Sequence, residues 1–194
     1  MYTALLKHIH HYCPLNKAEE QAVIESFNLL ELKKKSLILE AGQFCKTNYF
    51  VSKGCLRLFF FNDKGVEQTT QFAIENWWIS DYTSLALKKP SEFYLQTVED
   101  SSIMVLESAA EEALFERVPK LERYFRLMFQ RAYGASQHLA KYNHNLSREA
   151  HYRHFSKSFP DFVQRIPQYM LASFLGFTPE FLSKIRAKKD QPIS

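Results

Sequence analysis

The sequence lacks the features that mark membrane, secreted and disulfide-rich proteins. Its apolar stretches, such as Leu58–Phe61, are far shorter than the roughly 18 residues that span a membrane. The first eight residues contain no extended apolar segment, so we expect no signal peptide. Three scattered cysteines, Cys13, Cys45 and Cys55, are too few for a disulfide framework. These absences predict reduced thiols and a cytoplasmic location.

Catalytic motifs are absent as well. The sequence contains no glycine-rich phosphate loop, no nucleophile elbow and no metal-hydrolase helix. The N-terminal group His8, His10, His11 and Cys13 is too crowded for a tetrahedral zinc pattern. We therefore expect no enzyme activity, no bound metal and no resident cofactor, and leave open an unidentified small-molecule effector.

Positive charge is concentrated at the C-terminal end of the chain. Residues 147–194 carry eight basic and four acidic side chains, whereas the 17 basic and 17 acidic residues before them balance. The net charge of +4 therefore lies entirely in the last quarter. A basic segment on a neutral body favours a polyanionic partner, although an ordinary solvated surface explains the charge equally well.

The hydrophobic periodicity predicts an α+β protein. Residues 3–32 have helical spacing, with a capping signal at Asn16. Residues 36–107 contain several short apolar segments separated by turn residues, with Asp63-Lys64-Gly65 as a hairpin signal, which is typical of an antiparallel β-roll. Residues 108–146 are again helical.

The long helix carries a regular apolar seam that indicates a homodimer. Apolar residues recur there with alternating steps of four and three, as in a coiled coil. The seam consists of Leu121, Phe125, Met128, Ala132, Ala135, Leu139, Tyr142 and Leu146. The alternative is that this face packs on the protein's own β-roll, but so narrow a stripe favours another helix.

A helix-turn-helix is predicted between residues 165 and 188. Gly176 ends the first helix, Thr178 caps the second, and Pro179 occupies its first position. Ala172 is small enough for a close helix crossing. The residues predicted to contact DNA are those left on the outer face of the second helix or just beyond it: Thr178, Glu180, Ser183, Lys184, Arg186, Lys188 and Lys189.

The order of these elements and the segment LASFLGFTPEFLSKIR at 171–186 resemble the CRP/FNR family of bacterial regulators, in the branch abundant in Bacteroidetes. The resemblance covers nearly the whole chain. It implies a cyclic-nucleotide-binding-like, cupin-like β-roll (a double-stranded β-helix), a homodimer joined by the long helix, and a palindromic DNA site. It also implies that Glu180 and Lys184 read bases, and it makes RNA polymerase a candidate partner. Pro179 replaces the arginine often found at its position in the family.

The effector cassette departs from that family pattern. Ser80 and Asp81 stand where cyclic-nucleotide-binding members have Gly-Glu, and Glu92 is assigned to the position of the phosphate-binding arginine. A glutamate would repel a phosphate, so we predict that cyclic AMP is not the effector. The candidate pocket residues are Trp78, Ser80, Asp81, Tyr82, Thr83, Ser84, Glu92 and Tyr94. Core packing is the alternative role for their aromatic members.

The sequence thus predicts a DNA-binding transcription regulator. We expect a sensor β-roll domain with N-terminal helices at 1–118, a long dimerisation helix at 119–146 and a helix-turn-helix DNA-binding domain at 147–194. The competing interpretation is a β-roll dimer that binds a ligand or a protein partner without binding DNA. The short segment 158–165 leaves little room for the wing hairpin that the resemblance implies, which favours fewer phosphate contacts and weaker DNA affinity.

Overall fold

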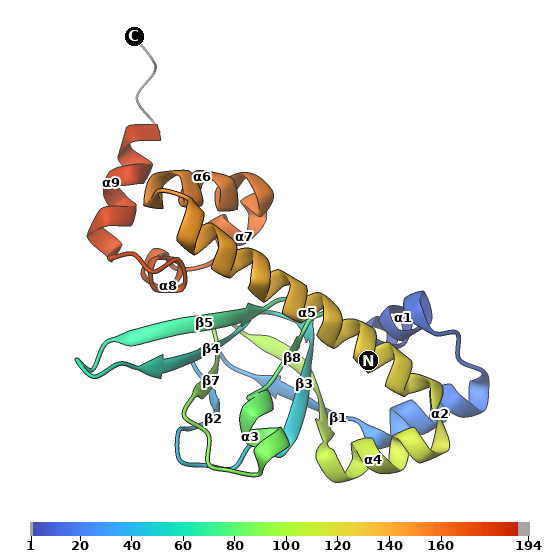
Figure 1. Ribbon diagram of the computed structural model, residues 1–194. Coiled ribbons are helices and arrows are strands. Elements are labelled where there is room, and N and C mark those ends of the chain that lie inside the picture. Colours follow the sequence, from blue (N-terminus) through green and yellow to red (C-terminus); the bar gives the residue numbers. More distant parts are fainter. Residues whose placement is uncertain (1, 190–194) are drawn as a thin grey trace. The chain divides into compact units, whose positions relative to one another are not determined.

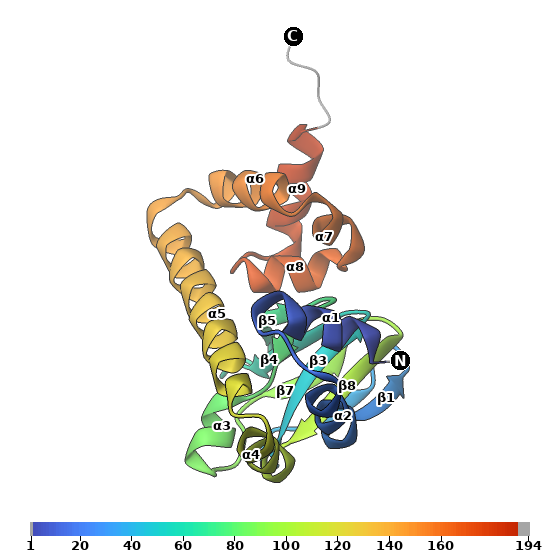
Figure 2. The same ribbon diagram turned by 90° about the vertical axis from the view of Figure 1, so that its right-hand side faces the viewer.

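The computed structural model describes residues 2–189, with side chains through residue 187, and the chain divides into two compact units. Of the described residues, the first unit contains 2–60 and 70–131, and the second contains 61–69 and 132–189. Figures 1 and 2 show the elements of both from two sides. The fold class is as predicted, since an antiparallel β-roll, a long helix and C-terminal helices are all present. In the described part of the chain, no helix is both long and apolar enough to cross a lipid bilayer.

The β-roll consists of two antiparallel four-stranded sheets. The first sheet has the order β1-β8-β3-β6, formed by β1 (Asn28–Leu32), β3 (Thr47–Lys53), β6 (Trp78–Ile79) and β8 (Ser101–Glu107). The second has the order β2-β7-β4-β5, formed by β2 (Leu37–Leu39), β4 (Leu56–Phe61), β5 (Glu67–Ala73) and β7 (Tyr94–Thr97). The turn Asp63-Lys64-Gly65 joins β4 to β5, as predicted.

Helices cover the outer face of the first sheet. They are α1 (Thr3–Tyr12), α2 (Lys17–Ser26), α4 (Ser108–Arg117) and the beginning of α5 (Lys120–Asn145). The capping box predicted at Asn16 is present, because its side chain accepts from the Glu19 backbone and the Glu19 carboxylate accepts from the Asn16 backbone. The expectation of helix through residue 32 was wrong for residues 28–32, which form β1 and pair with β8.

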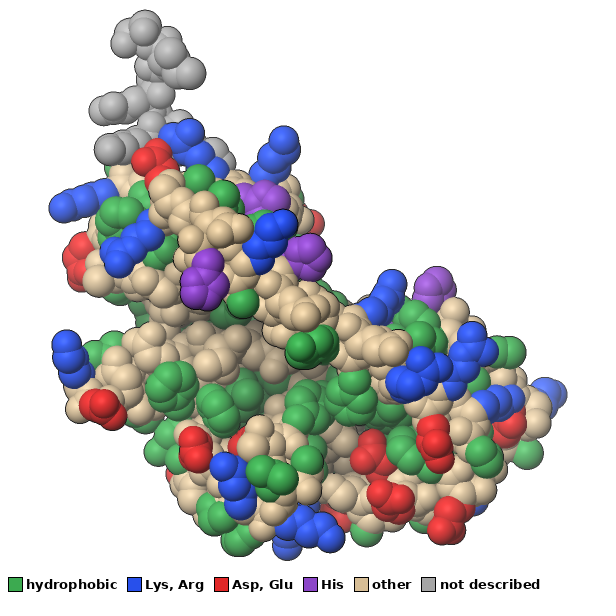
Figure 3. All heavy atoms as spheres, in the orientation of Figure 1, with side chains coloured by type: hydrophobic (Ala, Val, Ile, Leu, Met, Phe, Trp, Pro, Cys, Tyr) green, Lys and Arg blue, Asp and Glu red, His purple; other side chains and the backbone are tan. Residues whose placement is uncertain are grey.

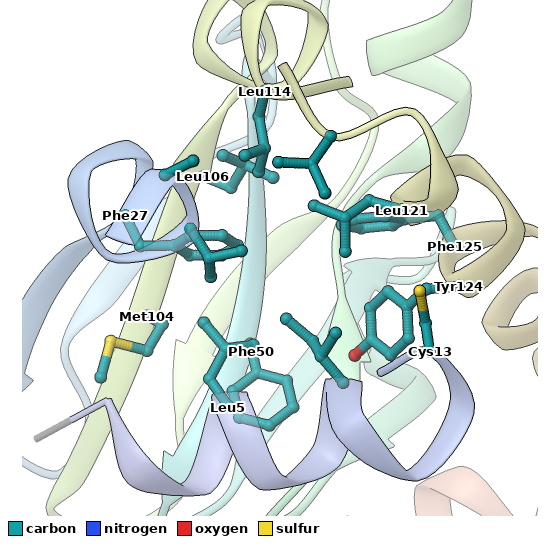
Figure 4. Close-up of a cluster of buried hydrophobic side chains, with 14 residues drawn as sticks. Leu5, Cys13, Phe27, Phe50, Met104, Leu106, Leu114, Leu121, Tyr124 and Phe125 are labelled. Carbon is teal, nitrogen blue, oxygen red and sulfur yellow. The ribbon is translucent and has the colours of Figure 1, made fainter. Parts of the chain in front are cut away.

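Side chains of β3 alternate between two cores, as the period of a strand requires. Tyr49 and Val51 point into the space between the two sheets, whereas Phe50 faces the helices. The helix-facing core, shown in Figure 4, joins α1, α4 and α5 to the sheet through Leu5, Leu114, Leu121 and other apolar side chains. Each fully buried large apolar residue of this kind contributes about 1.5–3 kcal/mol to folding.

One glycine is required by a close backbone approach. Gly54, in the turn between β3 and β4, has φ +103. A Cβ at this position would lie 2.7 Å from Ser101 Cα, which is closer than real Cβ contacts. Any other residue at position 54 would therefore require the backbone of the β3–β4 turn to shift.

The described part of the second unit contains the C-terminal half of α5 and four further helices. These are α6 (Arg148–Ser158), α7 (Pro160–Arg165), α8 (Gln168–Phe174) and α9 (Pro179–Lys189). Ser147 caps α6 by accepting from the Ala150 backbone, and Pro160 begins α7. In segment 158–165, where the sequence left little room for a wing hairpin, Ser158 ends α6 and residues 160–165 form α7.

Candidate nucleic-acid interface and effector cassette

Helices α8 and α9 are joined by a turn that two backbone hydrogen bonds hold in place. The Phe177 N–H donates to the Ala172 carbonyl at 2.8 Å, and the Gly176 N–H donates to the Ser173 carbonyl at 3.1 Å. This pair of bonds is a Schellman motif, which needs positive φ at its glycine, and Gly176 has φ +73. The turn is therefore fixed by local geometry.

The start of α9 is capped as the sequence predicts. The Thr178 hydroxyl accepts from the Phe181 N–H at 3.3 Å, and Pro179 occupies the first helical position. Hydrogen bonds from the Glu180 backbone and from Thr178 lower the pKa of the Glu180 carboxyl, with a smaller effect of Lys184 one turn later. Glu180 is therefore ionised and positioned at the N-terminus of the helix, where a carboxylate is favoured.

The two faces of α9 have opposite characters. Leu182 and Ile185 are buried, and Phe177 fills the turn beneath them. The exposed face contains Thr178, Glu180, Ser183 and Lys184, and Arg186 is half-buried. All seven predicted DNA-contacting residues thus lie on α9 or at its cap, and four of the five whose side chains are described are exposed. The side chains of Lys188 and Lys189 lie outside the described residues.

Basic and imidazole side chains are exposed over the helices of the second unit on the face shown in Figure 3. Exposed residues of α6 include Arg153, His154 and Lys157. Arg153 forms an ion pair with Glu149 at 2.6 Å, which neutralises part of this charge. The surface can contact phosphates without a deep cleft.

Ser173, a residue of α8, was not among the predicted site residues. Its side chain binds the backbone of β5 at the end of the β4–β5 hairpin that belongs to the second unit. Its hydroxyl accepts from the Thr69 N–H and donates to the Glu67 carbonyl, both at 2.9 Å. The only sequence signal is a serine among the apolar residues of α8. A contact between residues 104 positions apart leaves no local pattern in the sequence.

The predicted seam of α5 divides into two parts. Leu121 and Phe125 are 1% and 6% exposed and pack in the protein's own helix-facing core, which corrects the expectation that they face a second chain. Met128 packs at the edge of that core. The rest of the seam is exposed or half-buried: Ala132, Ala135, Leu139, Tyr142 and Leu146. Only this second part is accessible to a partner helix, and its Tyr142 ring also contacts His154 of α6.

The effector cassette is built around the short helix α3 (Tyr82–Leu87), and its carboxylate is already engaged. Asp81 Oδ1 accepts from the backbone N–H groups of Thr83 and Ser84 at 3.0 and 3.1 Å, and Oδ2 accepts from the Ser91 hydroxyl at 2.7 Å. The N–H groups that a phosphate would use at this helix start are thus bound to a fixed negative charge.

The other cassette residues also bond to the protein itself. The Ser80 hydroxyl donates to the Thr47 carbonyl at 2.6 Å, and the Ser84 hydroxyl accepts from the Cys45 N–H at 3.0 Å. Glu92, the residue after Ser91, is exposed, and its carboxylate lies 3.5 Å from Lys89 Nζ. Thr83 is exposed.

The aromatic cassette candidates lie in three different places. Trp78 packs against Phe50 and Phe125 in the helix-facing core, which corrects its assignment to a pocket. Tyr94 stacks on Phe59 with ring centroids 5.2 Å apart. Tyr82 contacts Phe129 of α5 edge to face at 5.0 Å. The structure therefore gathers Ser80, Asp81 and Ser84 but does not bring all eight candidates around one cavity.

Comparisons with known proteins identify the fold. No protein-family model matches the sequence, and no curated protein matches it. FixK2 from Bradyrhizobium japonicum aligns at a TM-score of 0.69 and 12% identity over 84% of this chain and 83% of FixK2. The c-di-GMP-responsive global regulator CLP of Xanthomonas campestris aligns at a TM-score of 0.70 and 12% identity over 90% and 91%. The Thermus thermophilus catabolite activator protein aligns at 0.56 and 19% identity over 93% and 85%.

The chain has the CRP fold. The neighbours named above are regulators of the CRP/FNR family, and they match both the β-roll and the helices that follow it. At 12% to 19% identity the likeness concerns the fold. Function therefore depends on what the chain's own side chains can do.

Proposed function

We propose that this protein is a DNA-binding transcription regulator that acts as a homodimer in the cytoplasm and has no enzymatic activity. The main support for this proposal is α9, a capped helix that follows a Schellman turn. The inner face of α9 is buried, and its outer face exposes Glu180, Ser183 and Lys184. Glutamate, serine and lysine are residue types that recognise base edges in the major groove. The segment 171–186 further favours the Bacteroidetes branch of the family.

The exposed half of α5 supports the dimer. One face of this half carries Ala132, Ala135 and Leu139, which are not part of the helix-facing core. In a dimer with a two-fold axis, the two α9 helices would enter successive major grooves about 34 Å apart. The expected operator is a palindrome with roughly 10-bp half-site spacing. RNA polymerase is the partner through which such a regulator would act.

The effector is proposed to be a molecule other than cyclic AMP. This rests on Asp81, whose carboxylate occupies the α3 N–H groups and the Ser91 hydroxyl. A phosphate brought to the same place would meet a buried negative charge, and the Asp81 hydrogen bonds would have to break.

The test of DNA binding begins with selection of duplexes from a random library by the full-length protein. Binding to the selected and scrambled duplexes is then measured by fluorescence anisotropy for the wild type, Lys184→Ala and Lys157→Ala. Lys184→Ala should cost about 1–3 kcal/mol on the selected site and relax one base position. Lys157, an exposed lysine of α6, is the matched control for loss of one charge, and its removal should affect both duplexes alike.

Two outcomes would contradict the proposal. If Lys184→Ala weakened selected and scrambled duplexes equally, Lys184 would contact phosphate and not a base. If the selection enriched no sequence and neither variant altered binding, the β-roll would serve as a ligand-binding or partner-binding dimer without a DNA role.

A further inference from the structure

An open pocket that shares no residue with the effector cassette lies beside the first helix. Its volume is about 590 Å³. Five residues of α1 and one residue of the β5–β6 turn line it: Thr3, Ala4, Lys7, His8, His11 and Asn76. The α1 members recur at steps of three and four, so they form one face of the helix, beside the face that buries Leu5 and Ile9 in the core. We call this site the α1 pocket.

The polar side chains of the α1 pocket offer N–H donors that the protein itself does not use. Lys7 and His11 are exposed and form no ion pair with any residue that the structure describes, and the Asn76 amide forms no hydrogen bond with one. No acid lines the pocket. Glu75, next to Asn76, accepts from the Gly54 N–H at 2.7 Å, so its carboxylate is engaged at the β3–β4 turn. The lining therefore leaves the charge of Lys7 uncompensated.

His8 is oriented by a hydrogen bond to the core. Its Nδ1 lies 2.7 Å from the Tyr124 hydroxyl, which also accepts from the Trp78 indole N–H at 2.9 Å (Figure 4). Because an indole can only donate, the Tyr124 proton goes to Nδ1, and a neutral His8 ring then carries its own proton on Nε2. Burial, His11 and Arg131 lower the pKa of His8, which keeps the ring neutral at pH 7. Within the described part of the chain, Nε2 has no acceptor.

Asn76 is attached to a backbone that the β-roll holds in place. It has φ +68, in the left-handed region that asparagine tolerates. Its backbone N–H donates to the Val51 carbonyl at 2.8 Å, and the Trp77 N–H donates to the Ile74 carbonyl at 3.0 Å. The turn and α1 therefore provide two fixed sides of the pocket, both within the first unit.

We propose that the α1 pocket binds a small organic carboxylate that carries an apolar chain or ring. Lys7 supplies the positive charge, and His8 Nε2 and the Asn76 amide donate to the carboxylate oxygens. The apolar part of the ligand lies on Ala4 and on the aliphatic stem of Lys7. A phosphate dianion fits this lining less well, because Lys7 is its only permanently charged residue and it contains no arginine.

The pocket is one hydrogen bond away from the long helix. A ligand that accepts from His8 Nε2 contacts the ring whose Nδ1 binds Tyr124, a residue of α5. A role of the carboxylate as effector rests on the proposed regulatory function. Binding of the carboxylate does not, and it is measured without DNA, so the two proposals can fail separately.

The probe is phenylacetate, with phenylacetamide as the neutral control of the same shape and inorganic phosphate as the control for a general anion site. Each is titrated into the full-length, ¹⁵N-labelled protein at pH 7 and followed by amide chemical shifts. Phenylacetate should bind with a dissociation constant of about 1 mM or below, with shifts centred on α1 and residues 74–77. Both controls should bind about tenfold more weakly or worse.

Three outcomes of these titrations would overturn the proposal. Equal binding of phenylacetamide would show that the charge is not recognised. Equal binding of inorganic phosphate at the same residues would show a general anion site and not one for organic carboxylates. Shifts centred outside α1 and the β5–β6 turn, or no saturation by about 10 mM, would exclude the α1 pocket.

Three variants at exposed positions locate the site without disturbing the core. Lys7→Gln should weaken phenylacetate binding by about twofold to fivefold, the range of an exposed ion pair. Asn76→Gly keeps the positive φ, removes the amide and should weaken binding by about threefold to tenfold. Lys46→Gln, just before β3 and outside the lining, is the matched control for the loss of one charge and should bind as the wild type does. Equal losses in the Lys7 and Lys46 variants would refute the assignment.

The role of His8 is read from its ring nitrogens. Imidazole ¹⁵N spectra of the free protein should show the tautomer with the proton on Nε2, and saturating phenylacetate should shift the Nε2 resonance more than that of Nδ1. A His8 proton on Nδ1, or an Nε2 resonance that phenylacetate leaves unchanged at saturation, would overturn the proposed binding mode.

Discussion

Removal of the buried Tyr124 hydroxyl tests how much its hydrogen bonds contribute to the stability of the first unit. Tyr124 is fully buried, and its oxygen accepts from the Trp78 indole N–H at 2.9 Å. The same hydroxyl lies 2.7 Å from His8 Nδ1. Because an indole nitrogen can only donate, the Tyr124 proton is directed to His8, which must be neutral at Nδ1. Burial, His11 and Arg131 lower the pKa of His8, in agreement with that assignment.

The substitution Tyr124→Phe keeps the ring and removes both hydrogen bonds. It leaves one donor on Trp78 and one acceptor on His8 without a partner, each worth about 1–3 kcal/mol when fully buried. Both side chains are half-buried, so water recovers part of the loss. We expect the free energy of unfolding to fall by about 2–4 kcal/mol.

Urea unfolding followed by tryptophan fluorescence measures this value for the first unit alone, because both tryptophans, Trp77 and Trp78, belong to it. Tyr133→Phe is the control, since Tyr133 is 67% exposed on the same helix. It should change stability by less than about 0.5 kcal/mol. A comparably small change for Tyr124→Phe, with an unchanged slope against urea, would show that the His8–Tyr124–Trp78 chain does not stabilise the fold.

Three further predictions address the dimer, the pH dependence and the effector. Leu139→Glu should convert dimers to monomers, because an unpaired charge in an apolar interface is costly, and sedimentation measures this change. Gln137→Glu, on the exposed side of α5, should leave the dimer intact. A wild-type protein that is monomeric at micromolar concentration would disprove dimerisation through the seam. Burial and His154 lower the pKa of His151 below 6.5, so its contribution to stability is present above pH 6.5 and is lost as pH falls below it. Thermal unfolding of the second unit should show this loss, and His151→Phe should flatten it; an unchanged profile would contradict the assignment. Calorimetric titration with cyclic AMP should show no binding, and a micromolar dissociation constant would refute the argument from Asp81.

The candidate DNA interface was predictable because its determinants are local. The turn at Gly176 and the cap at Thr178 act through hydrogen bonds between residues three to five positions apart. Pro179 acts through its fixed φ at the first helical position. The same is true of the capping box at Asn16 and of the β4–β5 turn. Backbone geometry of this kind leaves a signature in a single sequence.

The sequence by itself determined the order of elements, the α+β class and the exposed face of α9, since each follows from the period of apolar residues and from turn chemistry. Only the tertiary structure decided that residues 28–32 form a strand, because β1 exists through pairing with β8, from Asn28 with Val105 to Leu32 with Ser101. It also placed Leu121 and Phe125 in the protein's own core, since the seam's period is the same whichever surface covers it. The pairing of Asn48 with Glu111, 63 residues apart, and of His8 with Tyr124, 116 residues apart, arises from the approach of separate elements, and no local pattern encodes it.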